Sequence, residues 1–144
     1  MKISIGSDHA GFLLKEKVKK YLIEKGNEVR DFGTYSEDRA DYPDFAHLVA
    51  NEVENKKDNL GILLCGSGNG INMSANKHKG IRAALCWKRE IAILARQHNN
   101  ANILTLPARF IEENEAFKCV EAFISTSFEG GRHTERVKKI SEGC

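Results

Sequence analysis

Residues 60–70, Leu-Gly-Ile-Leu-Leu-Cys-Gly-Ser-Gly-Asn-Gly, join a nearly unbroken apolar run to a glycine-rich segment. Such a run is typical of a parallel strand that helices cover on both faces. The glycines predict a tight turn, after which Ile71 and Ala75 recur at helical spacing. Strand, turn and helix in succession indicate an α/β fold.

The same alternation continues on both sides of this stretch. Strands are expected at 3–6, 28–32, 60–65, 81–86 and 101–106, with helices following each of them, and Leu94 is expected to face inward in the helix over 89–98. No linker or internal repeat interrupts the chain, so a single domain over residues 1–144 is expected. The pattern predicts a three-layer αβα sandwich with a Rossmann-like, five-stranded parallel sheet and the strand order 2-1-3-4-5. Ligands then bind beyond the C-terminal ends of strands 1 and 3.

The composition excludes several classes of partner. The chain has 22 basic and 20 acidic residues, which gives a formal net charge of +2, and 41% of its residues are apolar. So small a charge produces no single-signed field for nucleic acid or an anionic membrane, and any anion site must be local. No apolar run approaches the roughly 18 residues of a membrane span, and the N-terminus is too polar for a signal peptide. A cytoplasmic protein is expected.

The cysteines show no pairing pattern. Cys65, Cys86, Cys119 and Cys144 are far apart, without a C-x-x-C pair or zinc-finger spacing, so free thiols and no metal site are expected. Cys65 differs from the others because it ends a strand directly before the glycine segment, where a helix N-terminus favours a thiolate. It is a candidate base or nucleophile, although a small buried apolar role is the alternative.

The glycine segment has its own two interpretations. Gly66, Gly68 and Gly70, with Ser67 and Asn69 between them, allow successive backbone N–H groups to converge on an anion at a helix N-terminus. Their spacing matches neither a dinucleotide fingerprint nor a P-loop, and a purely structural turn is the alternative. A cysteine-phosphatase loop is excluded because isoleucine occupies position 71, where arginine is required.

Polar residues elsewhere add candidates. Asp8 and His9 follow the first strand and face the same crevice, although Asp8 is equally suited to capping a helix. Tyr42 precedes the second helix and either offers a hydroxyl or packs. His98 and Asn99 end a helix that returns to the opposite edge of the sheet, so they reach Cys65 only from a partner chain.

Arginines form the last group of candidates. Arg132 and Arg136 are four residues apart, which places both on one helical face and suits a phosphate dianion. A solvated basic helix is the alternative, because lysines follow. Arg109 is a further isolated candidate.

Together, five segments closely resemble ribose-5-phosphate isomerase type B. They are Gly6-Ser7-Asp8-His9-Ala10-Gly11, Asp41-Tyr42-Pro43, Cys65-Gly66-Ser67-Gly68-Asn69-Gly70, Arg96-Gln97-His98-Asn99 and Glu129-Gly130-Gly131-Arg132-His133-x-x-Arg136. The resemblance spans nearly the whole chain. Galactose-6-phosphate and allose-6-phosphate isomerases are similar, so the reaction is better defined than the sugar.

The resemblance implies reversible isomerisation of D-ribose 5-phosphate and D-ribulose 5-phosphate, in the non-oxidative branch of the pentose phosphate pathway, without metal or cofactor. Cys65 would move a proton between C1 and C2 through a cis-enediolate. The amides of residues 66–70 and the Ser67 hydroxyl, where many members have threonine, would bind the enediolate oxygen. This replaces the interpretation of the glycine segment as a phosphate site.

The resemblance also implies roles for the remaining candidates. His98 would open the furanose ring with help from Asp8, Tyr42 and Asn99 would bind sugar oxygens, and the phosphate would be held by His9, Arg109, Arg132 and Arg136. Family sites form between two chains, which implies a homodimer with shared active sites and leaves open a dimer of dimers. A non-catalytic phosphosugar-binding module is the alternative from another class; the presence of Cys65 argues against it.

Overall fold

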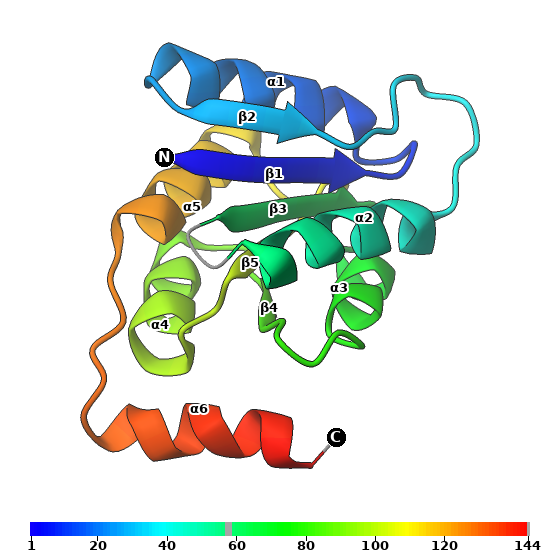
Figure 1. The fold of residues 1–144 in the computed structure, drawn as a ribbon. Coiled ribbons are helices and arrows are strands. Elements are labelled where there is room, and N and C mark those ends of the chain that lie inside the picture. The colour runs from blue at the N-terminus through cyan, green and yellow to red at the C-terminus, as the bar shows by residue number, and fades with distance from the viewer. Residues whose placement is uncertain (57–58, 144) are drawn as a thin grey trace.

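The computed structural model describes residues 1–56 and 59–143, so the expected thiol of Cys144 lies outside the described residues. Strands and helices alternate along the chain (Figure 1). The elements are β1 (Lys2–Ser7), α1 (Phe12–Glu24), β2 (Glu28–Asp31), α2 (Tyr42–Asn55), β3 (Leu60–Cys65), α3 (Asn69–Ala75), β4 (Ala83–Leu85), α4 (Arg89–Asn99), β5 (Ile103–Pro107), α5 (Glu113–Ser125) and α6 (Arg132–Glu142). Over the described residues, no helix has the length and apolar character that crossing a membrane requires.

All strand pairs of the sheet are parallel, and helices cover both of its faces. One face packs against α1, α4 and α5 through a core that includes Val18, Ala95 and Phe123. The other face packs against α2 and α3 through Val49 and Ile71. The three-layer αβα sandwich with a five-stranded parallel sheet is therefore confirmed.

The strand order differs in one place from the prediction. It is β2-β1-β3-β5-β4, so β5 lies beside β3 and β4 forms the edge. The predicted order 2-1-3-4-5 placed these two strands the other way round and is wrong at these positions. Burial gives the physical reason. All five residues of β5 are buried, whereas β4 is a strand of three half-buried residues. A strand buried along its whole length gains more from an interior position, and a short strand exposes fewer unpaired backbone groups at an edge.

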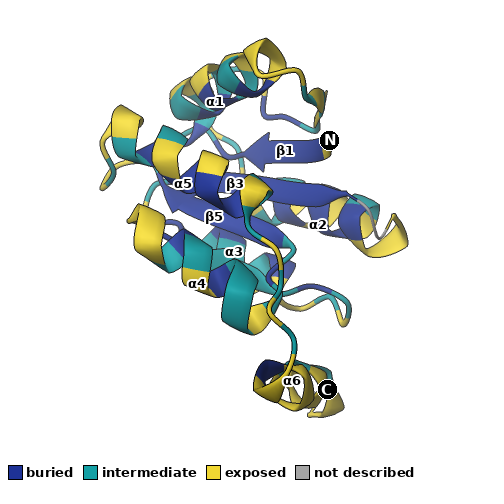
Figure 2. Ribbon diagram, turned by 90° about the vertical axis from the view of Figure 1, so that its left-hand side faces the viewer, coloured by how far each residue is buried: buried dark blue, intermediate teal, exposed yellow. Residues whose placement is uncertain are grey.

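Every residue of the central strand β3 is buried (Figure 2). Its packing is so close that a Cβ added at Gly61 would lie 2.8 Å from Cγ1 of Ile103 and 3.0 Å from Cγ1 of Val49. Leu94 departs from expectation, because it is 42% exposed on α4 and Ala92 is buried instead. Cys65, the last residue of β3, is thus held at the end of a closely packed strand.

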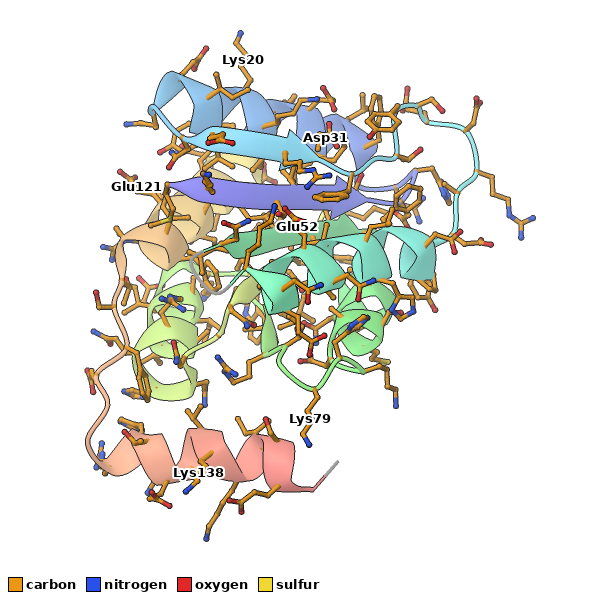
Figure 3. All side chains as sticks on the ribbon, in the orientation of Figure 1. Lys20, Asp31, Glu52, Lys79, Glu121 and Lys138 are labelled. Carbon is orange, nitrogen blue, oxygen red and sulfur yellow. The ribbon has the colours of Figure 1, made fainter. Side chains whose placement is uncertain are left out.

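A buried ion pair fixes the segment after β2. The Lys15 side chain is fully buried, and its Nζ lies 2.7 Å from both carboxylate oxygens of Asp31, which Figure 3 labels beside α1. Burial alone would raise the pKa of Asp31, but hydrogen bonds from Lys15, Lys19 and the Gly33 N–H outweigh burial and lower it. The charged carboxylate therefore anchors the chain where it turns from β2 towards α2.

Helix α6 stands apart from the sandwich (Figure 2). It contacts α4, and His133 is its one buried residue among those described. The connection from α5 is fixed to α4 by two backbone acceptors: Arg96 Nε donates to the Thr126 carbonyl at 3.1 Å, and the Glu129 N–H donates to the Gln97 carbonyl at 3.1 Å. Gly130 and Gly131 then have φ of 69° and 53°, which glycine adopts without strain, and turn the chain into α6.

Candidate active site

A pocket of about 340 Å³ opens at the C-terminal edge of the sheet, where β1 and β3 lie side by side. The residues that line it are Asp8, His9, Ala10, Tyr42, Cys65, Gly66, Ser67, Gly70, Arg109 and Phe110. The crevice predicted from the sequence is therefore present at the position where the strand order reverses. Phe110 is the lining side chain that sequence reasoning missed, because a lone aromatic residue after β5 carries no motif.

Cys65 is 4% exposed in this pocket and is a free thiol. Burial raises the pKa of its thiol, and the charge of Asp8 raises it further. The backbone N–H groups of Ile71, Gly68 and Ser67 act in the opposite direction but do not compensate. The expectation that the helix N-terminus favours a thiolate is correct for these donors, whereas burial has the larger effect.

The glycine segment turns sharply between β3 and α3. Gly68 has φ of 77° and precedes the first residue of α3, and a Cβ on it would lie 2.4 Å from Cδ1 of Leu85. A Cβ on Gly70 would lie 2.5 Å from Cζ of Tyr42. Glycine is thus needed both for the left-handed backbone and for the close approach of the tyrosine ring to the loop.

Asp8 and His9 form the opposite side of the pocket. Asp8 is 6% exposed, and its Oδ1 accepts a 3.1 Å hydrogen bond from the Gly11 N–H. This bond tightens the turn before α1, so the local role of Asp8 and its place in the pocket coexist. Nδ1 of His9 lies 3.1 Å from the carbonyl oxygen of Ala40, which links the pocket to the segment that precedes α2.

Arg109 approaches the pocket from the end of β5. Its N–H donates to the Gly66 carbonyl at 3.0 Å, and the Ala108 N–H donates to the Cys65 carbonyl at 2.9 Å. These bonds tie the segment after β5 to the C-terminal end of β3. The Arg109 side chain lies against Gly66, where an added Cβ would be 3.3 Å from its NH1 nitrogen. The exposed guanidinium brings a positive charge to the mouth of the pocket.

Six predicted residues do not line the pocket: Gly68, Asn69, His98, Asn99, Arg132 and Arg136. Gly68 and Asn69 belong to the glycine segment at the start of α3. His98 and Asn99 end α4, which returns to the N-terminal edge of the sheet, and the two arginines are exposed on α6. The two edges are separated by the length of β3, roughly 17 Å at about 3.3 Å per residue. The chain therefore presents its predicted site residues in two groups, as the helix direction predicts.

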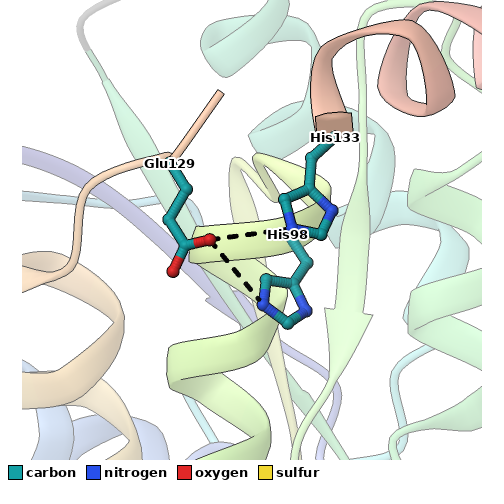
Figure 4. A group of neighbouring side chains, drawn as sticks. All are labelled: His98, Glu129 and His133. Carbon is teal, nitrogen blue, oxygen red and sulfur yellow. Dashed lines mark ion pairs between the residues drawn. The ribbon is translucent and has the colours of Figure 1, made fainter. Parts of the chain in front are cut away.

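His98 of the second group forms a cluster with Glu129 and His133 that the sequence did not predict (Figure 4). The imidazole rings of His98 and His133 stack with centroids 4.2 Å apart and an interplanar angle of 12°. Nε2 of His98 lies 4.0 Å, and Nε2 of His133 3.6 Å, from the same carboxylate oxygen of Glu129. The i,i+4 spacing of Glu129 and His133 was the available signal, but nothing in the sequence joins that turn to the end of α4.

Comparisons with known proteins extend over nearly the whole chain. The family model described as Ribose/Galactose Isomerase matches residues 3–140. Ribose-5-phosphate isomerase B from Escherichia coli is 44% identical over 140 residues, covering 97% of this chain and 94% of the relative.

Two solved structures show the same likeness. The crystal structure of a ribose 5-phosphate isomerase from Thermotoga maritima has a TM-score of 0.96 and 56% identity, covering 98% of this chain and 97% of that one. Ribose-5-phosphate isomerase B from Mycoplasma genitalium, solved with bound ribulose-5-phosphate, has a TM-score of 0.94 and 47% identity, covering 99% and 95%. The chain belongs to the ribose/galactose isomerase family.

Proposed function

We propose that this chain is an aldose–ketose isomerase that interconverts D-ribose 5-phosphate and D-ribulose 5-phosphate, with one isomerase domain over residues 1–144. The observation that carries the proposal is the buried Cys65 thiol, which faces the backbone N–H donors of the glycine segment in a pocket that Arg109 also lines. A thiol, amide donors and a cation supply a base, an oxyanion site and a phosphate contact. The names of the relatives support the choice of sugar.

The isomerisation requires one proton to move between two neighbouring carbons. Cys65, as thiolate, removes the proton from C2 of the open-chain aldose, and the resulting thiol returns it to C1 of the enediolate. The amides of Ser67, Gly68 and Ile71 stabilise the oxygen on which negative charge develops, and the Ser67 hydroxyl adds a donor. Gly66, Asn69 and Gly70 complete the turn that orients these donors. A proton must also pass from the oxygen on C2 to the oxygen on C1, and Asp8, which lines the same pocket, carries it.

The ring must open before this chemistry, and the phosphate must be bound. His98 transfers the protons of ring opening with Asp8, while Tyr42 and Asn99 bind sugar oxygens. His9 and Arg109 contact the phosphate from one chain, and Arg132 and Arg136 contact it from the partner. This arrangement requires a homodimer with shared sites, because the two groups of residues lie at opposite edges of one sheet.

An apolar surface beside the pocket supports the dimer. A groove of about 420 Å³ is lined by Ser67, Asn69, Leu85, Trp87, Pro107 and Phe110. Trp87 is 51% and Phe110 75% exposed, and large aromatic side chains of this kind are enriched in interfaces. Because Ser67 and Phe110 line both this groove and the substrate pocket, a chain seated on the groove would reach the substrate.

A coupled assay with three substrates tests the proposal. We expect turnover of ribose 5-phosphate to exceed that of allose 6-phosphate and galactose 6-phosphate. Faster turnover of either hexose phosphate would support the proposed aldose–ketose isomerisation but would identify a different sugar as the substrate. Saturable binding of all three without turnover would instead identify a phosphosugar-binding module and contradict the proposed activity.

A further inference from the structure

We propose that His98, Glu129 and His133 form a binding site for a divalent transition-metal ion of the zinc class, and that occupancy of this site removes His98 from ring opening. Among the described residues, these three form the group whose ligand atoms all lie within 4.8 Å of one another. Two imidazoles and one carboxylate are a ligand set that zinc accepts, with the remaining positions open to water.

The state of His133 points to a missing partner. Its side chain is only 6% exposed, yet its Nε2 has no hydrogen-bond partner. That atom faces Glu129 Oε2 at 3.6 Å, which is beyond hydrogen-bonding distance (Figure 4). A buried polar atom left without a partner calls for a group that satisfies it, and an ion seated between the three side chains would do so.

Backbone hydrogen bonds hold the three ligands on separate elements. Glu129 is fixed to α4 by the bond from its N–H to the Gln97 carbonyl, one residue before His98 in the sequence. The His133 N–H donates to the Gly130 carbonyl at 3.0 Å, which forms the first turn of α6. An ion would thus join the end of α4, the connecting segment and α6, where the protein side chains themselves make long contacts.

A second histidine pair shows what a satisfied cluster looks like. Nδ1 of His47 lies 2.8 Å from Nε2 of His78, and Nδ1 of His78 lies 3.5 Å from Oε2 of Glu54. There the two rings are hydrogen-bonded to each other, so one ring donates and the other accepts. At His98 and His133, by contrast, both Nε2 atoms face one carboxylate oxygen. The His47–His78 pair is therefore a matched control with the same residue types.

Metal binding needs a defined rearrangement. Ligand atoms around tetrahedral zinc are about 3.4 Å apart for bonds of about 2.1 Å, so the atoms must approach by less than about 1.5 Å. Parallel rings do not direct both lone pairs to one point, and the 36% exposed side chain of His98 must turn. Arg132 and Arg136 oppose a cation, so binding is expected to be weaker than in structural zinc sites.

Cobalt and zinc titrations test the site itself. The full chain is used with Cys65→Ala, so that the pocket thiol does not compete, and visible absorption of Co²⁺ reports the ligands. We expect one Co²⁺ per chain with no thiolate charge-transfer band, and displacement by Zn²⁺. Glu129→Gln, at an exposed residue, and His133→Asn should each weaken binding by about tenfold or more, whereas His78→Asn should leave it unchanged. Absence of saturable binding, or equal affinity in Glu129→Gln, would overturn the site.

The inhibitory consequence rests on the proposed function and is measured separately. With Cys65 present, Zn²⁺ should inhibit isomerisation, a chelator should restore it, and Glu129→Gln should need about tenfold more metal for the same inhibition. Metal binding without inhibition would overturn the link to ring opening. Cobalt binding in a chain that isomerises none of the sugar phosphates would contradict the proposed function and leave the metal site standing.

Discussion

The two groups of site residues are built on different supports. Cys65 lies at the end of a fully buried strand, and its loop is fixed by backbone bonds from the segment after β5. His98, Arg132 and Arg136 lie at a helix end and on an exposed helix, joined through two glycines with positive φ. The buried group suits proton transfer, which needs fixed geometry and low solvation. The exposed group suits contacts that a second chain completes.

The largest effect is expected at the buried group. Cys65→Ala should lower kcat by about 10³-fold, near the middle of the range for a general base, while the affinity for sugar phosphate stays within a few-fold. Steady-state turnover together with calorimetric binding measures both. Cys86→Ala is the matched control, because Cys86 is also a buried thiol but lies outside the pocket. Unchanged turnover in Cys65→Ala would exclude Cys65 as the base.

Mixed dimers test whether the two groups come from different chains. Cys65→Ala and His98→Ala chains should each be inactive, and a mixed dimer should contain one site with both native residues. Random 1:1 mixing makes half of the dimers mixed, so about a quarter of the wild-type activity is expected. Verified mixed dimers that remain inactive would contradict sharing, and monomers in solution would do so as well.

Removing the charges of the exposed group should change mainly KM, whereas removing the Cys65 thiol should change mainly kcat. Arg132→Ala and Arg136→Ala each remove a charge-assisted contact to phosphate worth about 1.5–3 kcal/mol, so KM should rise about 10- to 100-fold with a smaller change in kcat. Lys138→Ala is the control, since it removes an exposed charge from the same helix. A fall in kcat at unchanged KM would place the arginines in the chemical step instead.

The fold was predictable where the sequence pattern is local. The apolar run 60–65 and the strand β3 have the same limits, because a strand buried on both faces leaves no ambiguity of period. The order of β4 and β5 was not predictable in the same way. It depends on which of two apolar segments buries more surface in the finished sheet, and the sequence of 81–86 looks as apolar as that of 101–106.

The same distinction between local pattern and tertiary packing applies to the candidate site. The pocket residues Asp8, Cys65 and Ser67 follow strands whose ends must meet, so their proximity follows from the topology. Phe110 and the contact between His98 and His133 depend on how two loops fold back, which no periodicity encodes. The direction of the pKa of Cys65 also escaped prediction, because the depth of the pocket determines whether burial or the amide donors prevail.

The smallest predicted effect concerns pH and distinguishes the buried group from any exposed base. A thiol with a raised pKa is protonated at neutral pH. As the pH rises towards that pKa, the fraction of active thiolate therefore increases about tenfold per pH unit. The value of kcat/KM should therefore keep rising above the ordinary pKa of a cysteine. Asp8→Asn removes a charge that raises this pKa and should move the rising limb to lower pH.

Alkylation of Cys65 by iodoacetamide, located by mass spectrometry, should follow the same curve as kcat/KM. Cys86 and Cys119 provide an internal reference, because burial raises the pKa of each to about 12 and leaves them unreactive over the range that is assayed. A plateau of kcat/KM near pH 7 would mean that the proton-transferring group is less buried than Cys65. The chemistry would then belong to the exposed group, and the contrast between the two supports would fail.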